Sequence, residues 1–200
     1  MITELVPEEY EEKYVHKTYS AIAESFSKTR YKIWPCVSQF INSIPIDETI
    51  LEIGCGNGKN MIRPTTMTGI DMCDTFVDIC KSKGLNVIHG DALNLPFDDN
   101  TFGNALCVAV IHHLSTKERR SKVIEEAIRV TKPNGLIFIS VWLEHDDYKG
   151  DSIVEFHKKS RYYYLFKHDE LVEMVENIVS QQLIKTFVEA GNEIVILRKQ

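Results

Sequence analysis

The first part of the chain places apolar side chains at the spacing of an α-helix. Four of them recur at intervals of four, three and four residues: Val15, Tyr19, Ile22 and Phe26. This spacing is typical of one face of a helix, and it predicts a helix over about residues 8–28, after Pro7. A second, shorter helix is expected over about 33–43, because Pro45 prevents it from continuing.

From about residue 49 onward, short apolar runs alternate with helical patterns. The apolar runs predict strands over about 49–53, 67–71, 86–90, 102–110 and 136–142. Helices are expected directly after the first run, near 74–83, and from Ser115, because Ser115-Thr-Lys-Glu118 has the spacing of a capping box. This alternation predicts a parallel sheet with helices on both faces.

Beyond residue 143 the pattern changes. Residues 144–167 are polar and aromatic without a clear period, so we interpret 143–167 as a lid or insertion. Asp169 is expected to cap a helix whose inward residues are Leu171, Val172, Val175, Ile178 and Val179. Two strands over 182–188 and 193–198, joined around Gly191-Asn192, would form a hairpin.

These elements predict one α/β domain over residues 1–200. Its parts are N-terminal helices (1–45), a ligand-binding core (46–142), the lid (143–167), and a C-terminal helix and hairpin (168–200). We expect a seven-stranded, mostly parallel, doubly wound and Rossmann-like sheet that ends in an antiparallel hairpin. That is the arrangement of class I S-adenosylmethionine (SAM)-dependent methyltransferases, with the N-terminal helices over the ligand.

A glycine-rich loop follows the first predicted strand in the motif Glu52-Ile-Gly-Cys-Gly-Asn-Gly58. Glycine allows a sharp turn and a close approach of the backbone to a ligand. Lys59 stands where a dinucleotide fingerprint has its third glycine. The motif therefore favours SAM, which has no pyrophosphate, over NAD. A purely structural turn is the alternative.

Acidic residues stand at the ends of three successive predicted strands: Glu52, Asp71 and Asp91. Open parallel sheets bind ligands at the carboxyl ends of their strands. Asp71 is therefore expected to accept the ribose hydroxyls and Asp91 the adenine amine, although each acid alone could cap a helix or a turn. The expected cofactor-binding set is Glu52, Gly54, Gly56, Gly58, Asp71, Asp91, Ala92 and Val108.

Composition narrows the class of protein. The chain is 44% apolar and 26% charged, as in soluble globular proteins, and no apolar run approaches the roughly 20 residues that span a bilayer. No secretory signal is apparent, so we expect a cytoplasmic protein, and a nuclear location is also compatible with the sequence.

The five cysteines include no Cys-x-x-Cys pair, and no metal site is expected. With a net charge of −6, any nucleic-acid role needs local basic patches or a basic partner.

Several stretches resemble the tRNA wobble-uridine carboxymethyl methyltransferases, class I SAM-dependent enzymes. The most selective is Val108-Ala-Val-Ile-His-His-Leu-Ser-Thr-Lys-Glu-Arg-Arg120. The similarity covers nearly the whole chain, including residues 14–32, 51–59, 141–142 and 161–166. The chain departs from the family in a short 143–160 segment and in Gly191-Asn192-Glu193, where Gly-Asn-Trp is usual.

The resemblance implies a function. Such an enzyme methylates the carboxylate of 5-carboxymethyluridine at the wobble position of tRNA and yields 5-methoxycarbonylmethyluridine. The resemblance also implies a small zinc-binding activator subunit. This subunit would extend the sheet beside the third predicted strand, at Leu85–His89.

The acceptor would then be a carboxylate that is already ionised at neutral pH, so it needs positioning rather than a general base. Candidates to hold an anionic group are Arg30, His113, Arg119 and Arg120, with Trp142 and Tyr31 as stacking walls and Arg161 and Tyr162 as further substrate contacts. Basic residues near this mouth are Lys13, His16, Lys17, Lys28 and Lys32, and His157, Lys158, Lys159 and Lys167 of the lid.

Simpler interpretations stand beside these. Arg30 could be solvated, His113 could be structural, one of Arg119 and Arg120 could face solvent, and Trp142 could belong to the core. The tyrosines at 162–164 could pack the lid. Two other functions also fit the fold: a methyltransferase that acts on a quinone precursor or free acid, and a non-catalytic SAM-binding scaffold.

Overall fold

The computed structural model describes residues 5–156, 158–178 and 181–200. The expectations for His157 and Val179 concern residues outside this description. No helix within it is both long and apolar enough to cross a bilayer.

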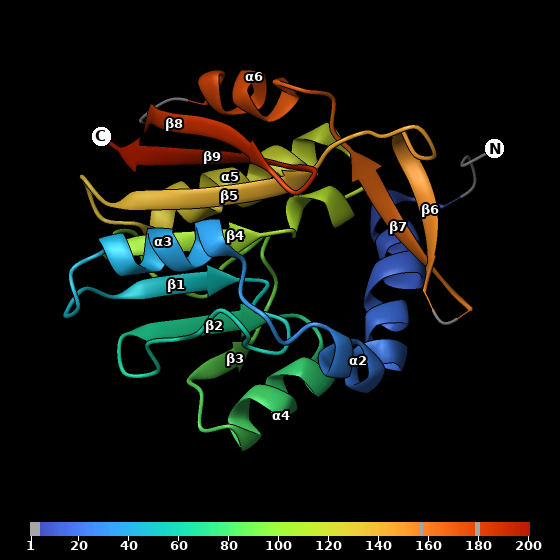
Figure 1. The fold of residues 1–200 in the computed structure, drawn as a ribbon, viewed down its shortest axis with the longest axis horizontal. Coiled ribbons are helices and arrows are strands. Elements are labelled where there is room, and N and C mark those ends of the chain that lie inside the picture. Colours follow the sequence, from blue (N-terminus) through green and yellow to red (C-terminus); the bar gives the residue numbers. More distant parts are fainter. Residues whose placement is uncertain (1–4, 157, 179–180) are drawn as a thin grey trace.

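A seven-stranded sheet forms the centre of the molecule (Figure 1). Its strands run in the order β3-β2-β1-β4-β5-β9-β8. The first five are parallel, β9 is antiparallel to β5, and β8 is antiparallel to β9. The predicted fold class is confirmed. The strands are β1 (Ile50–Ile53), β2 (Met67–Asp71), β3 (Val87–His89), β4 (Asn104–Val108), β5 (Leu136–Trp142), β8 (Gln181–Glu189) and β9 (Asn192–Lys199).

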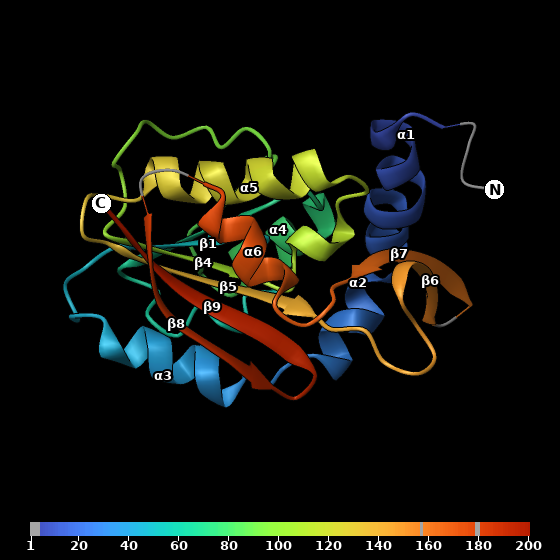
Figure 2. The ribbon, with the colours of Figure 1, turned by 90° about the horizontal axis from the view of Figure 1, so that it is seen from above.

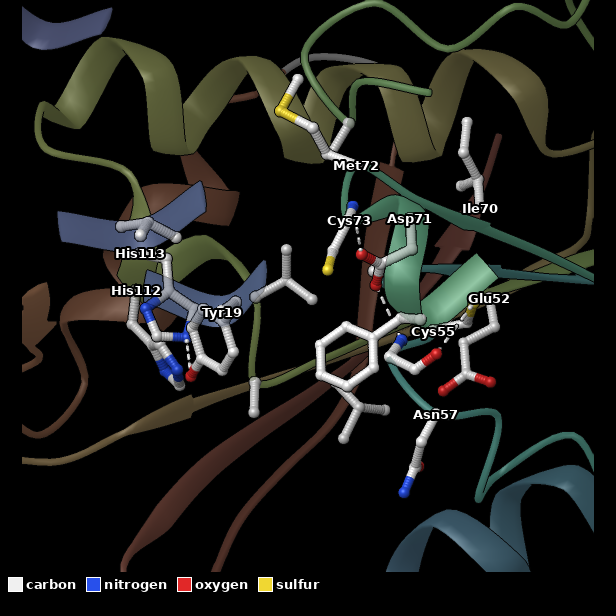
Figure 3. A pocket seen from close by; sticks show the side chains of 18 of the residues that line it. Tyr19, Glu52, Cys55, Asn57, Ile70, Asp71, Met72, Cys73, His112 and His113 are labelled. Atoms are coloured by element: carbon white, nitrogen blue, oxygen red, sulfur yellow. Dashed lines mark hydrogen bonds between the residues drawn. The ribbon is translucent and has the colours of Figure 1, made fainter. Parts of the chain in front are cut away.

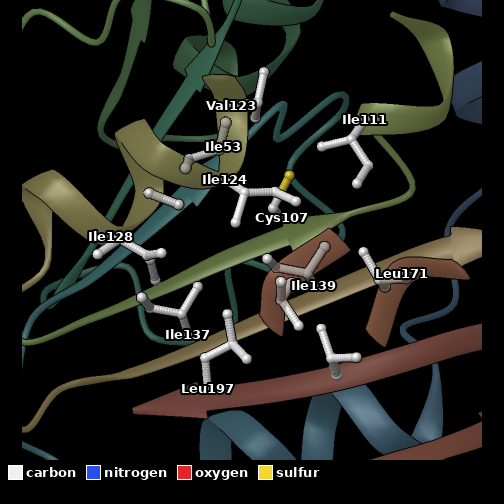
Figure 4. Close-up of a cluster of buried hydrophobic side chains, with 14 of the residues drawn as sticks. Ile53, Cys107, Ile111, Val123, Ile124, Ile128, Ile137, Ile139, Leu171 and Leu197 are labelled. Atoms are coloured by element: carbon white, nitrogen blue, oxygen red, sulfur yellow. The ribbon is translucent and has the colours of Figure 1, made fainter. Parts of the chain in front are cut away.

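Helices cover both faces of this sheet (Figure 2). On one face, α3 (Pro35–Ser43) and α4 (Asp74–Ser82) pack through a cluster that includes Phe40 and Val77. On the other face lie α5 (Lys117–Val130) and α6 (Glu170–Glu176). There the apolar residues of α5 meet the apolar side chains of β4 and β5 (Figure 4): Val123, Ile124, Ala127 and Ile128 are all buried. Apolar burial on two faces explains why the central strands read as continuous hydrophobic runs.

The N-terminal helix forms as predicted but is not uniform. It divides into α1 (Pro7–Glu11), a π-helical turn η1 (Glu12–His16) and α2 (Lys17–Thr29). After the π turn, the Thr18 hydroxyl donates to the carbonyl oxygen of Ser160, 3.1 Å away. Apolar spacing alone did not reveal the turn.

The helix expected directly after the glycine loop is absent, and this prediction was wrong. Residues 58–66 form consecutive turns instead, with the Met61 amide bonded to the carbonyl of Gly58 and the Thr66 amide to that of Arg63. The segment before β2 is too short for a stable helix, and Pro64 interrupts it.

The lid segment is more regular than expected. It contains a two-stranded antiparallel sheet of β6 (Gly150–Phe156) and β7 (Lys159–Leu165). Burial alternates along β6, as expected for a strand with one covered face. The turn between the strands includes Lys158 at φ 62°, a conformation usually supplied by glycine or asparagine. The sequence therefore lacked the usual hairpin signal.

Two predicted helix caps are wrong. Thr116, not Ser115, caps α5 by accepting a hydrogen bond from the Arg119 amide. Asp169 has φ 66° and makes no side-chain cap, whereas the buried Glu193 accepts from the amides of Asp169 (2.7 Å) and Leu171 (3.2 Å). The Ser115 amide and hydroxyl instead donate to Glu11, so in both cases a residue far away along the chain decides the cap.

The C-terminal hairpin is confirmed, with its turn one residue earlier than predicted. Ala190 and Gly191 take φ values of 50° and 75°, and Asn192 already belongs to β9. Positive φ at both turn residues is typical of the two-residue turns that match strand twist. A 3₁₀ turn, η2 (Ile111–His113), completes the elements around the site.

Candidate active site

A cavity of about 230 Å³ lies where the carboxyl ends of the parallel strands meet the N-terminal helix (Figure 3). The strands β1, β2 and β4 point toward α2 (Figure 1), and residues of α2 and β7 complete the lining. The wall includes these predicted site residues: Arg30, Glu52, Gly54, Gly56, Asp71, Asp91, Ala92, Val108, His113, Trp142 and Arg161. The fold thus brings most of the candidate residues to one place.

The glycine loop forms one end of the cavity. Gly54, Gly56 and Gly58 all have positive φ, between 53° and 73°. A Cβ on Gly54 would collide with the side chain of Val110, so both conformation and space require glycine there. A Cβ on Gly58 would meet Leu85 and Cys80 instead, outside the cavity. Gly58 is therefore needed for the packing of the loop against α4.

Asp71 locks the loop from the end of β2. Its Oδ2 accepts from the Gly56 amide (2.7 Å) and its Oδ1 from the Cys73 amide (2.9 Å), as Figure 3 shows. Burial raises the pKa of Asp71, and the two backbone donors oppose that rise. Each carboxylate oxygen keeps a further lone pair, so Asp71 could also accept hydroxyl groups of a ligand in the cavity.

Glu52 lies beside the loop and is almost completely buried. Its Oε1 accepts from Asn60 Nδ2 at 2.7 Å, while Glu52 Oε2 and Asn60 Oδ1 have no partner. Burial raises the pKa of Glu52 to about 8. Buried carboxyl and amide oxygens without a partner are costly, and a cationic ligand group beside Glu52 would favour the charged, hydrogen-bond-accepting form of its carboxyl. The place of Glu52 and Asn60 in the cavity wall therefore suits a cationic ligand group with N–H donors, such as the ammonium group of SAM.

Asp91 and Ala92 form the wall beyond β3. Asp91 Oδ1 accepts from the Leu93 amide at 2.8 Å, which shapes the turn at this point. The second carboxylate oxygen of Asp91 is available to a ligand amine.

Aromatic and basic side chains form the opposite end of the cavity. His113 Nδ1 lies 2.9 Å from the carbonyl oxygen of Tyr162, so Nδ1 must carry the proton. His113 Nε2 then accepts from the Tyr19 hydroxyl at 3.0 Å (Figure 3). Burial lowers the pKa of His113 to about 3. His113 is therefore neutral at physiological pH, and both of its ring nitrogens are engaged by the protein.

Arg161 contributes the buried positive charge at this end. Its side chain is 4% exposed and leaves Nε without a partner. The guanidinium lies over the rings of Phe156 (5.0 Å) and Tyr163 (5.2 Å), and Nη1 is 3.5 Å from the Tyr19 hydroxyl. Within the described part of the chain, no carboxylate forms an ion pair with Arg161. A buried, unpaired guanidinium on a cavity wall suits an anionic ligand.

Arg30 and Trp142 complete this end. The exposed Arg30 side chain extends over the rings of Phe26 (5.5 Å) and Phe156 (5.8 Å). Trp142 stacks on Tyr163 with ring centroids 4.7 Å apart. Trp142 thus closes the wall at the end of β5.

Four other candidate residues do not line the cavity. Tyr31 is 68% exposed, and Tyr162 is buried with its hydroxyl bonded to Asp151. Arg119 forms a two-pronged ion pair with Glu11. Arg120 is buried: it donates to the Leu114 carbonyl, and its guanidinium carbon lies 3.6 Å from the centroid of the Tyr164 ring. Of the two arginines Arg119 is the one nearer to solvent, with 21% of its side chain exposed, and its ion pairs with Glu8 and Glu11 fix it in place.

Sequence reasoning also missed cavity residues. Tyr19 and Phe26 carry the helical period expected of a core face, yet both lie in the cavity wall, as do Asn57, His112 and Tyr163. Apolar spacing identifies a covered face, but it does not tell whether the cover is protein or ligand. The position of Asn57 between two loop glycines was the available signal for that residue.

Comparison with known proteins gives the family. A Methyltransferase domain family matches residues 51–139. The tRNA (carboxymethyluridine(34)-5-O)-methyltransferase of Schizosaccharomyces pombe is 36% identical over 203 residues, across 84% of this chain and 89% of that protein. The chain belongs to the tRNA (carboxymethyluridine(34)-5-O)-methyltransferase family. The resemblance noted from the sequence is thereby confirmed, and the protein is an enzyme of the methyltransferase class.

Other tRNA (carboxymethyluridine(34)-5-O)-methyltransferases are longer. That of Arabidopsis thaliana is 46% identical over 136 residues, which make up 67% of this chain and 34% of the relative. That of Saccharomyces cerevisiae is 39% identical over 138 residues, again 67% of this chain and 50% of the relative. The chain thus spans about a third to a half of these two relatives.

Solved structures agree on the fold. The 1,6-didemethyltoxoflavin-N1-methyltransferase of Burkholderia thailandensis, with bound S-adenosylhomocysteine, has a TM-score of 0.74 at 16% identity over 98% of this chain and 91% of that one. A methyltransferase in complex with the Haloferax volcanii Trm112 methyltransferase activator has a TM-score of 0.69 at 15% identity, over 90% and 97%. At these identities only the architecture is shared.

Proposed function

We propose that this protein transfers a methyl group from SAM to the carboxylate of 5-carboxymethyluridine at position 34 of tRNA. The product is the methyl ester, 5-methoxycarbonylmethyluridine. One observation carries the proposal: the cavity has acidic residues at one end, including Glu52 and Asp71 (Figure 3), and at the other the buried guanidinium of Arg161, which has no ion-pair partner among the described residues. This charge pattern suits a cationic donor beside an anionic acceptor.

The glycine-loop end of the cavity would hold the donor. When bound, SAM supplies a methyl group on a positively charged sulfur, and transfer to a carboxylate oxygen leaves a neutral thioether and a neutral ester. Glu52 Oε2 and Asn60 Oδ1 would accept from the ammonium group, and Asp71 would accept from the ribose hydroxyls. Asp91 would accept from the adenine amine. Gly54 and Gly56 let the backbone approach.

The other end would bind and orient the acceptor. A free carboxyl titrates near pH ~4, so the substrate is already a nucleophile and requires no proton transfer. The neutral, fully engaged His113 fits this chemistry, because it is not free to act as a base. Arg161 and Arg30 would offset the substrate's negative charge and direct one carboxylate oxygen, and Trp142 with Tyr163 would shield the site from water.

Exposed basic residues beside the cavity would contact phosphates of the tRNA. They lie on the N-terminal helix and around the β6–β7 turn: Lys13, Lys17, Lys28, Lys32, Lys158 and Lys159. Such contacts are weakened by salt. Because the net charge of the whole chain is −6, the attraction for tRNA has to come from these basic residues, alone or together with a basic partner protein.

We also propose an activator subunit at the β3 edge of the sheet. In the described structure β3 pairs only with β2, which leaves its other side open at residues 85–89. An unpaired edge strand is a site for strand addition. The Haloferax methyltransferase of the same fold is found with the Trm112 activator.

Transfer of labelled methyl groups tests the proposal. The protein, alone and with a zinc-binding activator, would receive labelled SAM and one of three acceptors: tRNA with 5-carboxymethyluridine, the same tRNA with unmodified uridine, or small carboxylic acids. We expect a base-labile label only on the first. Ester formation only on free acids would instead support a small-molecule methyltransferase. No transfer under any condition would support a non-catalytic role.

A further inference from the structure

Asn57 connects two parts of the site that are distant in sequence. Its side chain is 5% exposed and lies on the cavity wall (Figure 3). Asn57 Nδ2 donates to the carbonyl oxygens of Arg30 (2.9 Å) and Ser27 (3.4 Å), and its Oδ1 accepts from the Lys59 amide (3.2 Å). The amide group of one loop residue therefore holds the end of α2.

The backbone around Asn57 is itself held in place. The Asn57 carbonyl accepts from Lys83 Nζ at 2.7 Å, and the Gly56 carbonyl accepts from the Cys80 thiol at 3.2 Å. On the other side, the Gly56 amide donates to Asp71. Asn57 thus stands on the part of the loop that α4 and β2 fix, and that part also faces the proposed cofactor.

The end of α2 depends on such a partner. The last carbonyl groups of a helix have no partner inside the helix. Here no glycine closes it: the C-cap residue is Arg30, at φ −119° and ψ 61°. Asn57 satisfies two of the terminal carbonyls, including that of Arg30 itself. Asn57 of the glycine loop therefore fixes the direction in which the chain leaves α2. It thereby also fixes the position of the Arg30 backbone, from which the Arg30 side chain extends.

We infer that Asn57 is a positioning residue that couples occupancy of the cofactor loop to the placement of Arg30. The inference rests on the proposed function, because it assumes that Arg30 binds the acceptor carboxylate. It deepens that function: binding of the cofactor at the glycine loop would order the arginine that binds the acceptor. Asn57 acts through the backbone of α2 and need not touch the acceptor.

Hydrogen exchange measures this coupling without tRNA. The decisive variant is Asn57→Asp, which keeps the acceptor for the Lys59 amide and removes the donor to α2. Asn57→Ala is the uncharged second variant, and Asn42→Asp, an exposed asparagine on α3, is the matched control. S-adenosylhomocysteine should slow exchange of the amides at residues 27–32 in the wild type and the control. In both Asn57 variants the loop amides should still be protected, but residues 27–32 should not.

Two results would overturn the inference. One is ligand-dependent protection of residues 27–32 that persists in both Asn57 variants. The other is loss of S-adenosylhomocysteine binding, by calorimetry, in both variants, which would make Asn57 a residue of the cofactor loop alone.

A kinetic cycle with Arg30→Ala supplies the second test. We expect Asn57→Asp to lower kcat/KM for the tRNA by about tenfold, with the KM for SAM nearly unchanged, as for the loss of one or two hydrogen bonds. In the Arg30→Ala background the same change should cost less than about twofold, because interacting residues are not additive. Equal losses of kcat/KM in both backgrounds would contradict the coupling.

The two proposals can fail separately. If the wild-type enzyme makes no ester, the proposed function is rejected, while the hydrogen-exchange experiment still shows whether Asn57 couples the cofactor loop to residues 27–32.

Discussion

The two ends of the cavity are built in different ways. At the glycine-loop end, which we propose holds the methyl donor (the donor end), the residues come from neighbouring strand ends and are held largely by backbone hydrogen bonds, as Asp71 is by the amides of Gly56 and Cys73. At the aromatic end, which we propose holds the acceptor (the acceptor end), Tyr19, His113 and Tyr163 come from three distant segments and are held by side-chain contacts. The donor end therefore follows from local chain geometry, whereas the acceptor end exists only when distant elements pack together.

Charge separates the two ends as well. Glu52, Asp71 and Asp91 stand at the donor end, and Arg30 and Arg161 at the other. The burial of Glu52 and of Arg161 without full sets of partners leaves free energy that a ligand can recover. We therefore expect changes at the donor end to act on cofactor binding and changes at the acceptor end to act on methyl transfer.

The largest effect is expected at Asp71. The Asp71→Ala change removes two charge-assisted bonds, to the Gly56 amide of the glycine loop and to the Cys73 amide before α4, as well as the proposed ribose contact. Affinity for S-adenosylhomocysteine should therefore fall by about 10³-fold. Calorimetry measures it. The control is Asp74→Ala, an exposed carboxylate three residues further on, which should bind normally. Unchanged affinity of the Asp71 variant would contradict the assignment of this residue.

The acceptor end depends on the N-terminal helix, so the second prediction concerns the contacts that anchor this helix. Buried Glu11 accepts from the Arg119 guanidinium, the Ser115 amide and the Ser115 hydroxyl. Glu11→Ala leaves Arg119 without its buried partner, so the free energy of unfolding in urea should fall by about 3 kcal/mol. The exposed Glu12–Lys17 pair gives the control, because Glu12→Ala should cost less than about 0.5 kcal/mol. Similar losses in both variants would show that Glu11 does not anchor the helix.

Arg30 should separate transfer from cofactor binding. Arg30→Ala removes one of the two cations at the acceptor end, and kcat/KM for the tRNA should fall by about 30-fold, the effect of one charged hydrogen bond. Affinity for S-adenosylhomocysteine should remain. Lys28→Ala, an exposed cation in the same helix, serves as the control for general attraction of tRNA. A parallel fall in cofactor affinity would indicate a folding role for Arg30.

The smallest effect concerns the pH dependence of stability. The pKa of Glu52 is raised to about 8 in the folded protein from its ordinary value of 4.5, so the folded state binds the proton more tightly. Stability from this group is greatest below pH ~4.5 and is lost as the pH rises toward 8, by at most about 1.4 kcal/mol per pH unit. Urea unfolding from pH 5 to 8 should show a steeper decline for the wild type than for Glu52→Gln. Parallel curves would place Glu52 in a more polar environment.

The donor end could be predicted because backbone requirements are visible in the sequence. Positive φ values at Gly54 and Gly56 need glycine, and parallel strands bring the acids that follow them to one edge. The same reasoning identified the strands of the seven-stranded sheet and the C-terminal hairpin, but not the two strands β6 and β7. It failed directly after the glycine loop, where residues 58–66 form turns rather than a helix.

The acceptor end could not be predicted to the same depth. Arg119 and Arg161 are both arginines in the resembling motifs, yet Arg119 pairs with a carboxylate 108 residues away, whereas Arg161, at the cavity, forms no ion pair with any residue that the structure describes. Likewise, nothing near Glu193 indicates that it caps α6. Spacing along the chain does not encode which distant partner a charged side chain will meet.

The sequence by itself determined the strands of the central sheet, the glycine loop and the row of acids, because these depend on φ preferences and on hydrophobic period between near neighbours. Only the tertiary structure decided which arginine faces the cavity, which nitrogen of His113 carries the proton, and that Asn57 hydrogen-bonds to the end of α2. Those outcomes depend on burial and on hydrogen-bond partners that only the packing of distant segments brings within reach.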